Sequence, residues 1–181
     1  LLGYNQWDAN RADQASQDAL GKLEETLTET IEDKTKDEEP VVQPELDPEQ
    51  EMTVTDIDGW GYIGYLSIPS IGLELPVMSE WSYPRLKIAP CRQFGSSRTD
   101  DLVIAAHNYE SHFGKLTSLT AGDSVIFTDM DGIVNEYVVN KVEVLDPHSV
   151  EEVEHSGYAL VLYTCTYGGK TRVTVFCDRA S

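Results

Sequence analysis

From residue 60 onward, apolar residues occur in short runs that polar and turn-forming residues interrupt. Several runs alternate apolar and polar positions, while the run LVIAAH is apolar enough for a buried strand. The runs predict seven strands, at Trp60–Ile68, Leu73–Met78, Leu102–His107, Ser124–Thr128, Val134–Leu145, Tyr158–Thr164 and Thr171–Cys177. Short strands at close spacing, with few helices between them, predict a mostly β domain that is a barrel or a sandwich.

The beginning of the chain has a helical pattern instead. Residues 4–34 carry Leu20, Leu23, Leu27 and Ile31 at spacings of three and four, which predicts an amphipathic helix with one apolar stripe. Such a helix either packs on its own domain or serves as a spacer or a contact with a partner.

A proline-containing acidic segment separates this helix from the β domain. Pro40, Pro44 and Pro48 prevent a continuous helix, and the carboxylates around them repel one another. This composition indicates a linker or a loosely held acidic arm. We therefore expect three parts: an N-terminal amphipathic helix (1–36), an acidic linker or lid (37–56) and the β domain (57–181).

Composition narrows the choice of partners. The chain has 181 residues and a formal net charge of −19, and 16 of its 32 acidic residues lie in residues 1–56. This charge argues against nucleic acid or an anionic lipid surface as the main partner, because both require a basic surface. No apolar run approaches the roughly 18 residues of a membrane helix. Because the chain begins with Leu1, we expect an anchor or signal segment upstream.

The stretch Asp129–Gly132 lies between two of the predicted strands. Asp-Gly between apolar runs is typical of a hairpin turn. Its acidic pair also suggests calcium, but the other ligand positions of a calcium loop are absent, so we predict a plain turn.

Two predicted strands end in reactive side chains. The run LVIAA leads to His107, the run ALVLYT leads to Cys165, and Arg172 begins the next strand after a short turn. If the first two strands are parallel, His107 and Cys165 emerge at one rim, and the antiparallel strand returns Arg172 to it. A thiolate can attack a carbonyl, an imidazolium can protonate the leaving amine, and a guanidinium can hold an oxyanion. Taken singly, each residue fits a structural role better: Cys165 as a buried thiol at a strand end and His107 as a hydrogen-bonded histidine at a strand terminus.

These residues form a pattern that resembles the sortase family. Leu162–Cys165 with Arg172 resembles the Leu-x-Thr-Cys…Arg signature, and Ala106–Asn108 resembles the histidine strand. Residues 61–69 and 73–77 resemble the first two strands, so the similarity covers roughly residues 59–179 in the correct order.

The resemblance implies an eight-stranded β-barrel with short helices, preceded here by the helix and the acidic linker. It also implies a Gram-positive cell-surface cysteine transpeptidase, grouped with the cysteine endopeptidases. Such an enzyme cleaves a Leu-Pro-x-Thr-Gly (LPxTG) sorting signal on surface proteins. It then transfers the acyl group to an amine, which is a peptidoglycan cross-bridge or a pilin lysine.

By the same resemblance, each site residue has an expected role. Cys165 is the nucleophile, His107 the acid/base, and Arg172 the substrate and oxyanion clamp. Thr164, Asn108 and Tyr167 are candidates for substrate binding. No cofactor or metal is required by this chemistry. We expect the histidine of the following loop, His112, to be solvated.

The class within the family stays open between a class B-like and a pilin-type (class C-like) enzyme. Val161 stands where sortases often have Thr or Ser. Pilin-type sortases cover the site with a lid that carries an Asp-Pro-aromatic tip. Asp47 and Pro48 of the acidic arm match the start of that tip, but Glu49 replaces the aromatic residue.

The two remaining cysteines allow two alternatives. Cys177 lies about 16 Å along its strand from Arg172, so it should lie at the rim opposite the site. Cys91 precedes the strand that leads to His107, so we expect it near that opposite rim too. The pair then forms a disulfide, which an extracellular setting permits, or remains as two free thiols.

Two other functions are alternatives to a sortase. A hydrolytic cysteine protease would use the same three residues but complete the reaction with water. A non-enzymatic surface interaction domain would use the acidic arm. The sortase resemblance itself implies an extracytoplasmic enzyme at the cell surface, anchored in the membrane by a segment upstream of Leu1.

Overall fold

The chain is described here by a computed structural model. The residues that the structure describes are residue 11 and residues 14–28, 51–107, 112–113, 115–146, 153, 156–164 and 172–180.

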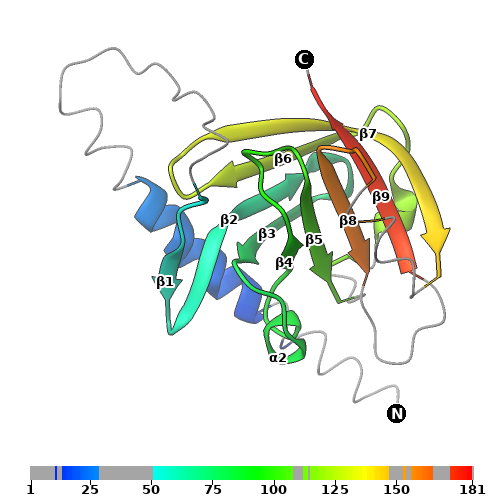
Figure 1. The fold of residues 1–181 in the computed structure, drawn as a ribbon. Coiled ribbons are helices and arrows are strands. Elements are labelled where there is room, and N and C mark those ends of the chain that lie inside the picture. The colour runs from blue at the N-terminus through cyan, green and yellow to red at the C-terminus, as the bar shows by residue number, and fades with distance from the viewer. Residues whose placement is uncertain are drawn as a thin grey trace, which may run out of the picture.

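Within these residues the fold is mostly β (Figure 1). The strands are β1 (Thr55–Ile57), β2 (Trp60–Ile68), β3 (Leu73–Met78), β4 (Cys91–Phe94), β5 (Leu102–Ala106), β6 (Ser124–Asp129), β7 (Val134–Leu145), β8 (Leu160–Thr164) and β9 (Arg172–Arg179). Three short helices connect them, η1 (Pro69–Ile71), α2 (Tyr83–Leu86) and η2 (Leu116–Ser118). The sequence predicted seven of these strands but missed β1 and β4, because each is too short to show a periodic pattern.

Eight of the strands form a closed barrel. The order around the sheet is β2-β3-β4-β5-β8-β9-β7-β6, and β6 pairs again with β2. The strand β1 lies outside this ring and pairs only with β2. The predicted eight-stranded barrel is therefore confirmed, and closure leaves no open edge along most of the sheet.

Glycine at position 64 permits the closure. Gly64 pairs with Val77 of β3 on one side and with Asp129 of β6 on the other, next to a bulge in β2. A Cβ at this position would lie 2.1 Å from the carbonyl oxygen of Thr128. Only glycine lets the two backbones approach this closely.

The barrel has two apolar layers because several strands are buried on both faces. In β5, Leu102, Ile104 and Ala106 belong to the cluster that fills the barrel, while Val103 and Ala105 belong to a second cluster outside it. A strand that is buried on both faces has apolar residues at every position, which explains why residues 102–106 (LVIAA) are all apolar. The outer cluster must be covered, and the N-terminal helix covers part of it.

Residues 14–28 of the predicted N-terminal helix are helical and pack beside β1 to β3 (Figure 1). Leu23 and Leu27 are buried in the outer cluster with Ile57 of β1. Lys22 at the helix surface forms an ion pair with Asp58 in the turn after β1. For these residues the helix packs on its own domain, which was the first of the two alternatives.

Residues 51–56 of the predicted linker are also attached to the barrel. Met52 is buried in the barrel cluster, and the Thr53 hydroxyl donates to the Asp131 carboxylate. The segment between β6 and β7 that contains Asp131 is a plain turn, in which Asp129 accepts the backbone N–H groups of Asp131 and Ile133.

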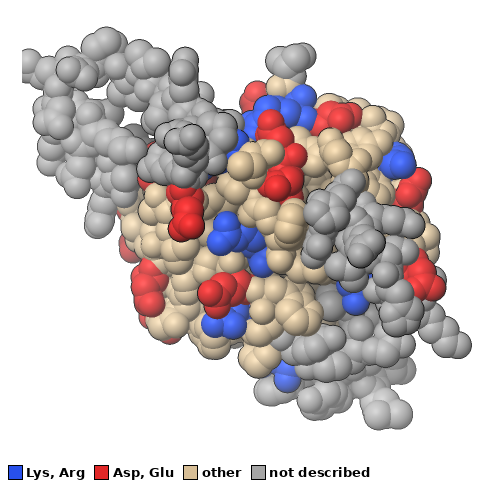
Figure 2. All heavy atoms as spheres, in the orientation of Figure 1, with Lys and Arg blue, Asp and Glu red and all other residues tan. Residues whose placement is uncertain are grey.

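Charged side chains are spread over the described surface. On the face in Figure 2, acidic side chains lie around the molecule, and basic side chains lie between them. No helix in the described ranges combines the length and hydropathy of a membrane span.

Candidate active site

The site predicted from the sequence lies where β5 and β8 end side by side. The two strands are parallel, and Ala106, the last residue of β5, pairs with Thr164, the last residue of β8. His107 therefore leaves the sheet at the level where β8 ends. Cys165 follows Thr164 in the sequence and lies outside the described residues.

Arg172 begins β9 at this same rim. The strands β8 and β9 are antiparallel, and Tyr163 pairs with Thr174. On its other side, Arg172 pairs with Leu145 at the end of β7. The strand register thus brings Arg172 back to the rim where His107 lies, as the sequence analysis expected for parallel β5 and β8.

These side chains belong to the outer face of the barrel. Ala105 and Tyr163 lie in the outer cluster, and the Arg172 guanidinium lies over the Tyr163 ring, with its Cζ 5.2 Å from the ring centroid. Side chains along β5 alternate between the two faces of the sheet. His107, two residues after Ala105, is therefore assigned to the outer face. A site built here opens onto the outside of the barrel and not into its filled interior.

Thr164 has a structural contact in this arrangement. Its side chain is buried, and its Oγ1 accepts the backbone N–H of Val173 at 3.1 Å. This bond links the end of β8 to the start of β9 and fixes the backbone beside Arg172. Substrate contact by Thr164 stays a prediction.

His107 is half-buried, and its carbonyl oxygen accepts the N–H of Phe113 at 3.2 Å. This bond turns the chain back against the barrel, where Phe113 is fully buried. The neighbouring His112 is also fully buried, so the expectation of a solvated loop histidine was wrong. The sequence gave little sign that His112 is buried, because Phe113 is the only apolar residue beside it.

The disulfide alternative is contradicted. Cys91 and Cys177 are not joined by a disulfide, and they lie in different layers, Cys91 in the outer cluster and Cys177 inside the barrel. Cys177 pairs with Leu160 at the start of β8, far from the rim as expected. Cys91 instead pairs with Ala105, because β4 is antiparallel to β5 and begins where β5 ends. The error came from missing β4.

Burial also makes Cys177 a poor nucleophile. It raises the pKa of the Cys177 thiol to about 12, with a smaller contribution from Asp178. The thiol therefore stays protonated at neutral pH and is shielded from reagents.

A polar network at the opposite rim was not anticipated from the sequence. The Arg98 guanidinium, whose side chain is 2% exposed, forms an ion pair with Asp131. Nearby, Arg179 donates to Asp100, to the Ser97 carbonyl oxygen and to Asn135. Burial raises the pKa of Asp129, and its bonds to backbone N–H groups partly offset this. Long-range ion pairs of this kind leave no periodic signal in a sequence.

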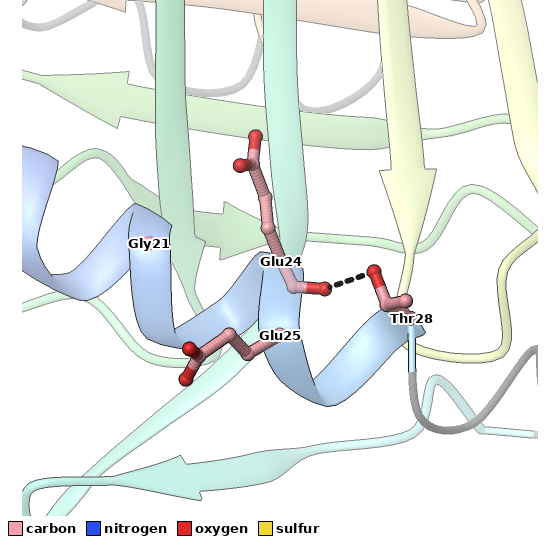
Figure 3. A pocket seen from close by; sticks show the side chains of 4 residues that line it. All are labelled: Gly21, Glu24, Glu25 and Thr28. Carbon is pink, nitrogen blue, oxygen red and sulfur yellow. Dashed lines mark hydrogen bonds between the residues drawn. The ribbon is translucent and has the colours of Figure 1, made fainter.

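One open depression lies on the N-terminal helix, and none of its described lining residues was predicted from the sequence as a site residue. It has a volume of about 430 Å³ and is lined by Gly21, Glu24, Glu25 and Thr28. In Figure 3 the Glu24 side chain points toward the strands and Glu25 points away from them. Among the described residues, no group of three His, Cys, Asp or Glu side chains is arranged to hold a metal ion.

Several predicted residues lie outside the described part of the chain. They are Cys165, Asn108 and Tyr167, and Asp47 and Pro48 of the proposed lid. Their predicted roles therefore stay predictions.

Comparisons with known proteins agree with this fold. A family model for the sortase domain matches residues 66–180. "Sortase A" of Bacillus anthracis is 27% identical over 171 residues, which cover 91% of this chain and 80% of that protein. The crystal structure of sortase C1 from Streptococcus agalactiae is 26% identical, with a TM-score of 0.57, and the match covers 70% of this chain and 71% of that one.

A third match extends over almost the whole chain. Sortase C from Streptococcus pneumoniae has a TM-score of 0.63 at 22% identity, over 91% of this chain and 97% of that chain. At this identity the likeness shows the fold alone.

The family model covers more than half of the chain, so the chain belongs to the sortase family. Sortases are cysteine transpeptidases that act outside the cytoplasm at the cell surface, on substrates that carry sorting signals. The chain is therefore a sortase-type enzyme, which excludes the non-enzymatic interaction domain as its main function.

Proposed function

We propose that this sortase cleaves an LPxTG-like sorting signal with Cys165 as its nucleophile. The observation that carries the proposal is the pairing of Ala106 with Thr164. It puts His107 beside the end of the strand that leads directly to Cys165, and the register of β9 brings Arg172 to the same end.

In the proposed reaction, the Cys165 thiolate attacks the carbonyl carbon of the Thr-Gly bond. A tetrahedral oxyanion forms, and Arg172 stabilises it and holds the substrate backbone. The C–N bond breaks, and protonated His107 gives its proton to the departing glycine amine. A second amine then attacks the thioester, loses a proton to His107 and releases the thiolate, so that the enzyme is regenerated.

The acceptor amine is a pilin lysine or a peptidoglycan cross-bridge. Sortase C of S. pneumoniae, whose structure was described with regard to pilin substrate specificity, is one of the similar structures, but a likeness at 22% identity does not choose between the two acceptors. The class within the family is still open, because related structures include sortases A, C and D.

Further residues have proposed roles around this centre. Asn108 and Tyr167 would contact the substrate from the loops after β5 and β8. Asp47 and Pro48 would act as a lid that moves aside when substrate binds. A membrane anchor would hold the enzyme at the surface, where its substrates emerge.

The proposal is tested with the purified chain, an LPxTG peptide library and an amine acceptor, with mass spectrometry as the readout. We expect an amide product from the wild type and none from Cys165→Ala. Cys177→Ala is the matched control, because its thiol is buried inside the barrel, and it should retain activity. Free acid without amide, across several acceptors, would favour the hydrolytic protease. Equal turnover by wild type and Cys165→Ala would contradict the proposal.

A further inference from the structure

The Arg172 guanidinium lies against one aromatic ring at the catalytic rim. Its Cζ is 5.2 Å from the centroid of the Tyr163 ring, within the range of a cation–π interaction. Because Tyr163 pairs with Thr174, Tyr163 and Arg172 are diagonal neighbours on adjacent antiparallel strands. Diagonal neighbours are about 7–8 Å apart, which long and aromatic side chains can bridge.

The ring is the fixed partner in this contact. Tyr163 is 3% exposed and belongs to the outer cluster. Its partner on the neighbouring strand β5 is Ala105, which is fully buried in the same cluster. Arg172 is half-buried, and a long arginine side chain has many rotamers unless something holds it.

The backbone at Arg172 is fixed independently. The N–H of the next residue, Val173, donates to Thr164 Oγ1 at 3.1 Å, and the Thr174 hydroxyl donates to the Arg172 carbonyl oxygen at 3.2 Å. The main chain thus has a defined position, and the Tyr163 ring supplies a surface that limits where the guanidinium can lie.

We propose that Tyr163 is a positioning residue that orients the Arg172 guanidinium for the reaction. This inference rests on the proposed role of Arg172 as substrate and oxyanion clamp. A clamp is most effective when its donors are oriented before charge develops, because no reorganisation is then needed during the reaction. Tyr163 also lies two residues before Cys165, so the ring holds the guanidinium on the strand that leads to the nucleophile.

A double-mutant cycle distinguishes this role from simple packing. Replacement of the ring by Tyr163→Leu should lower kcat/KM about tenfold, a size between that of an exposed and that of a fully desolvated cation–π contact. Tyr163→Phe keeps the ring and should stay within about twofold of the wild type. In an Arg172→Gln background, Tyr163→Leu should change kcat/KM by less than about twofold, because the side chain that it positions is gone. Should Tyr163→Leu not fold, Tyr163→Met takes its place.

Phe176→Leu is the matched control. Phe176 is a buried aromatic residue of the same outer cluster, and Lys141 lies over its ring at 5.0 Å. This variant should lose stability much as Tyr163→Leu does, yet keep kcat/KM within about twofold of the wild type.

NMR of the Arg172 side chain reports on the contact without any turnover. The Nε–H signal of Arg172, assigned by its loss in Arg172→Gln, should carry a ring-current shift that Tyr163→Phe keeps and Tyr163→Leu removes. An unchanged signal in Tyr163→Leu, or additive losses in the cycle, would overturn the role of Tyr163 while the enzyme remains an active transpeptidase. A wild type without any Cys165-dependent turnover would instead contradict the proposed function and the role built on it.

Discussion

The Glu24 carboxyl group of the N-terminal helix hydrogen-bonds to the Glu74 carboxyl group of β3. This bond, with burial and the charge of Glu74 as smaller causes, raises the pKa of Glu24 from 4.5 to about 7. Two carboxyl groups can share a hydrogen bond only while one of them is protonated. The contact between the helix and the barrel is therefore sensitive to pH.

The sign of this dependence follows from the raised pKa. The folded protein holds the proton more tightly than the unfolded chain, so the contribution is complete below about pH 4.5 and is lost as the pH rises through about 7. Both side chains are exposed, so solvent screening limits the effect to about 0.5 kcal/mol. Glu24→Gln should be more stable than the wild type at pH 8 by about this amount, and no more stable at pH 5.

Urea unfolding at the two pH values measures the difference. Glu25→Gln is the control, because it removes the same charge from a neighbouring side chain that points away from the strands (Figure 3). If Glu25→Gln shows the same change with pH as Glu24→Gln, the effect comes from net charge and not from the carboxyl pair.

The buried ion pair at the opposite rim should contribute strongly to stability. Arg98→Ala would leave the partly buried Asp131 carboxylate without its guanidinium and would remove a side chain that is only 2% exposed. We expect a loss of about 3 kcal/mol in the free energy of unfolding, measured in urea. Lys141→Ala, which breaks the exposed pair with Glu143, should cause little change. Similar small losses in both variants would show that the Arg98 pair is not buried in solution.

Barrel closure should depend on Gly64. In Gly64→Ala the new methyl group would overlap the Thr128 carbonyl oxygen at the point where β2 meets β6. We expect a loss of about 3 kcal/mol or more in unfolding free energy. Gly72→Ala is the control, because Gly72 also has a positive φ of 62° but nothing within 4 Å of the added methyl. Its loss should be about 1 kcal/mol, and equal losses would contradict the close approach at Gly64.

The three thiols should differ in reactivity. Under denaturing, non-reducing conditions, all three cysteines should titrate as free thiols. In the folded protein, Cys91 and Cys177 should react slowly with a thiol reagent, because both are fully buried. The fast thiol should be Cys165 and should vanish in Cys165→Ala. Fewer than three thiols after denaturation would reveal a disulfide.

Much of the fold could be predicted from local patterns. The continuous apolar run at residues 102–106 identified β5 as a buried strand, and the run at residues 158–164 identified β8 as a strand. Their parallel pairing followed from the proposal that His107 and Cys165 serve one site, not from any local signal. The strand β4 was missed because its four residues, of which two are polar, are too few to show a periodic pattern.

That omission had a consequence at the site. Without β4, Cys91 was assigned to the wrong rim, and a disulfide with Cys177 looked feasible. The burial of His112 and the Arg98–Asp131 ion pair could not be predicted from the sequence either. Both depend on contacts between residues far apart in the chain, which periodicity and turn signals do not record.

Thr164 provides a test of how β8 and β9 are held together at the catalytic rim. Thr164→Val keeps the shape of the side chain but removes the oxygen that accepts the Val173 N–H. Leaving this N–H without its acceptor should cost about 1–2 kcal/mol of unfolding free energy. It should also lower kcat by loosening the start of β9, where Arg172 lies. Thr164→Ser keeps the oxygen and should preserve most of the unfolding free energy and most of kcat. If Thr164→Val instead raised KM without loss of stability, the hydroxyl would be contacting substrate, and the link to Val173 would not be its main role.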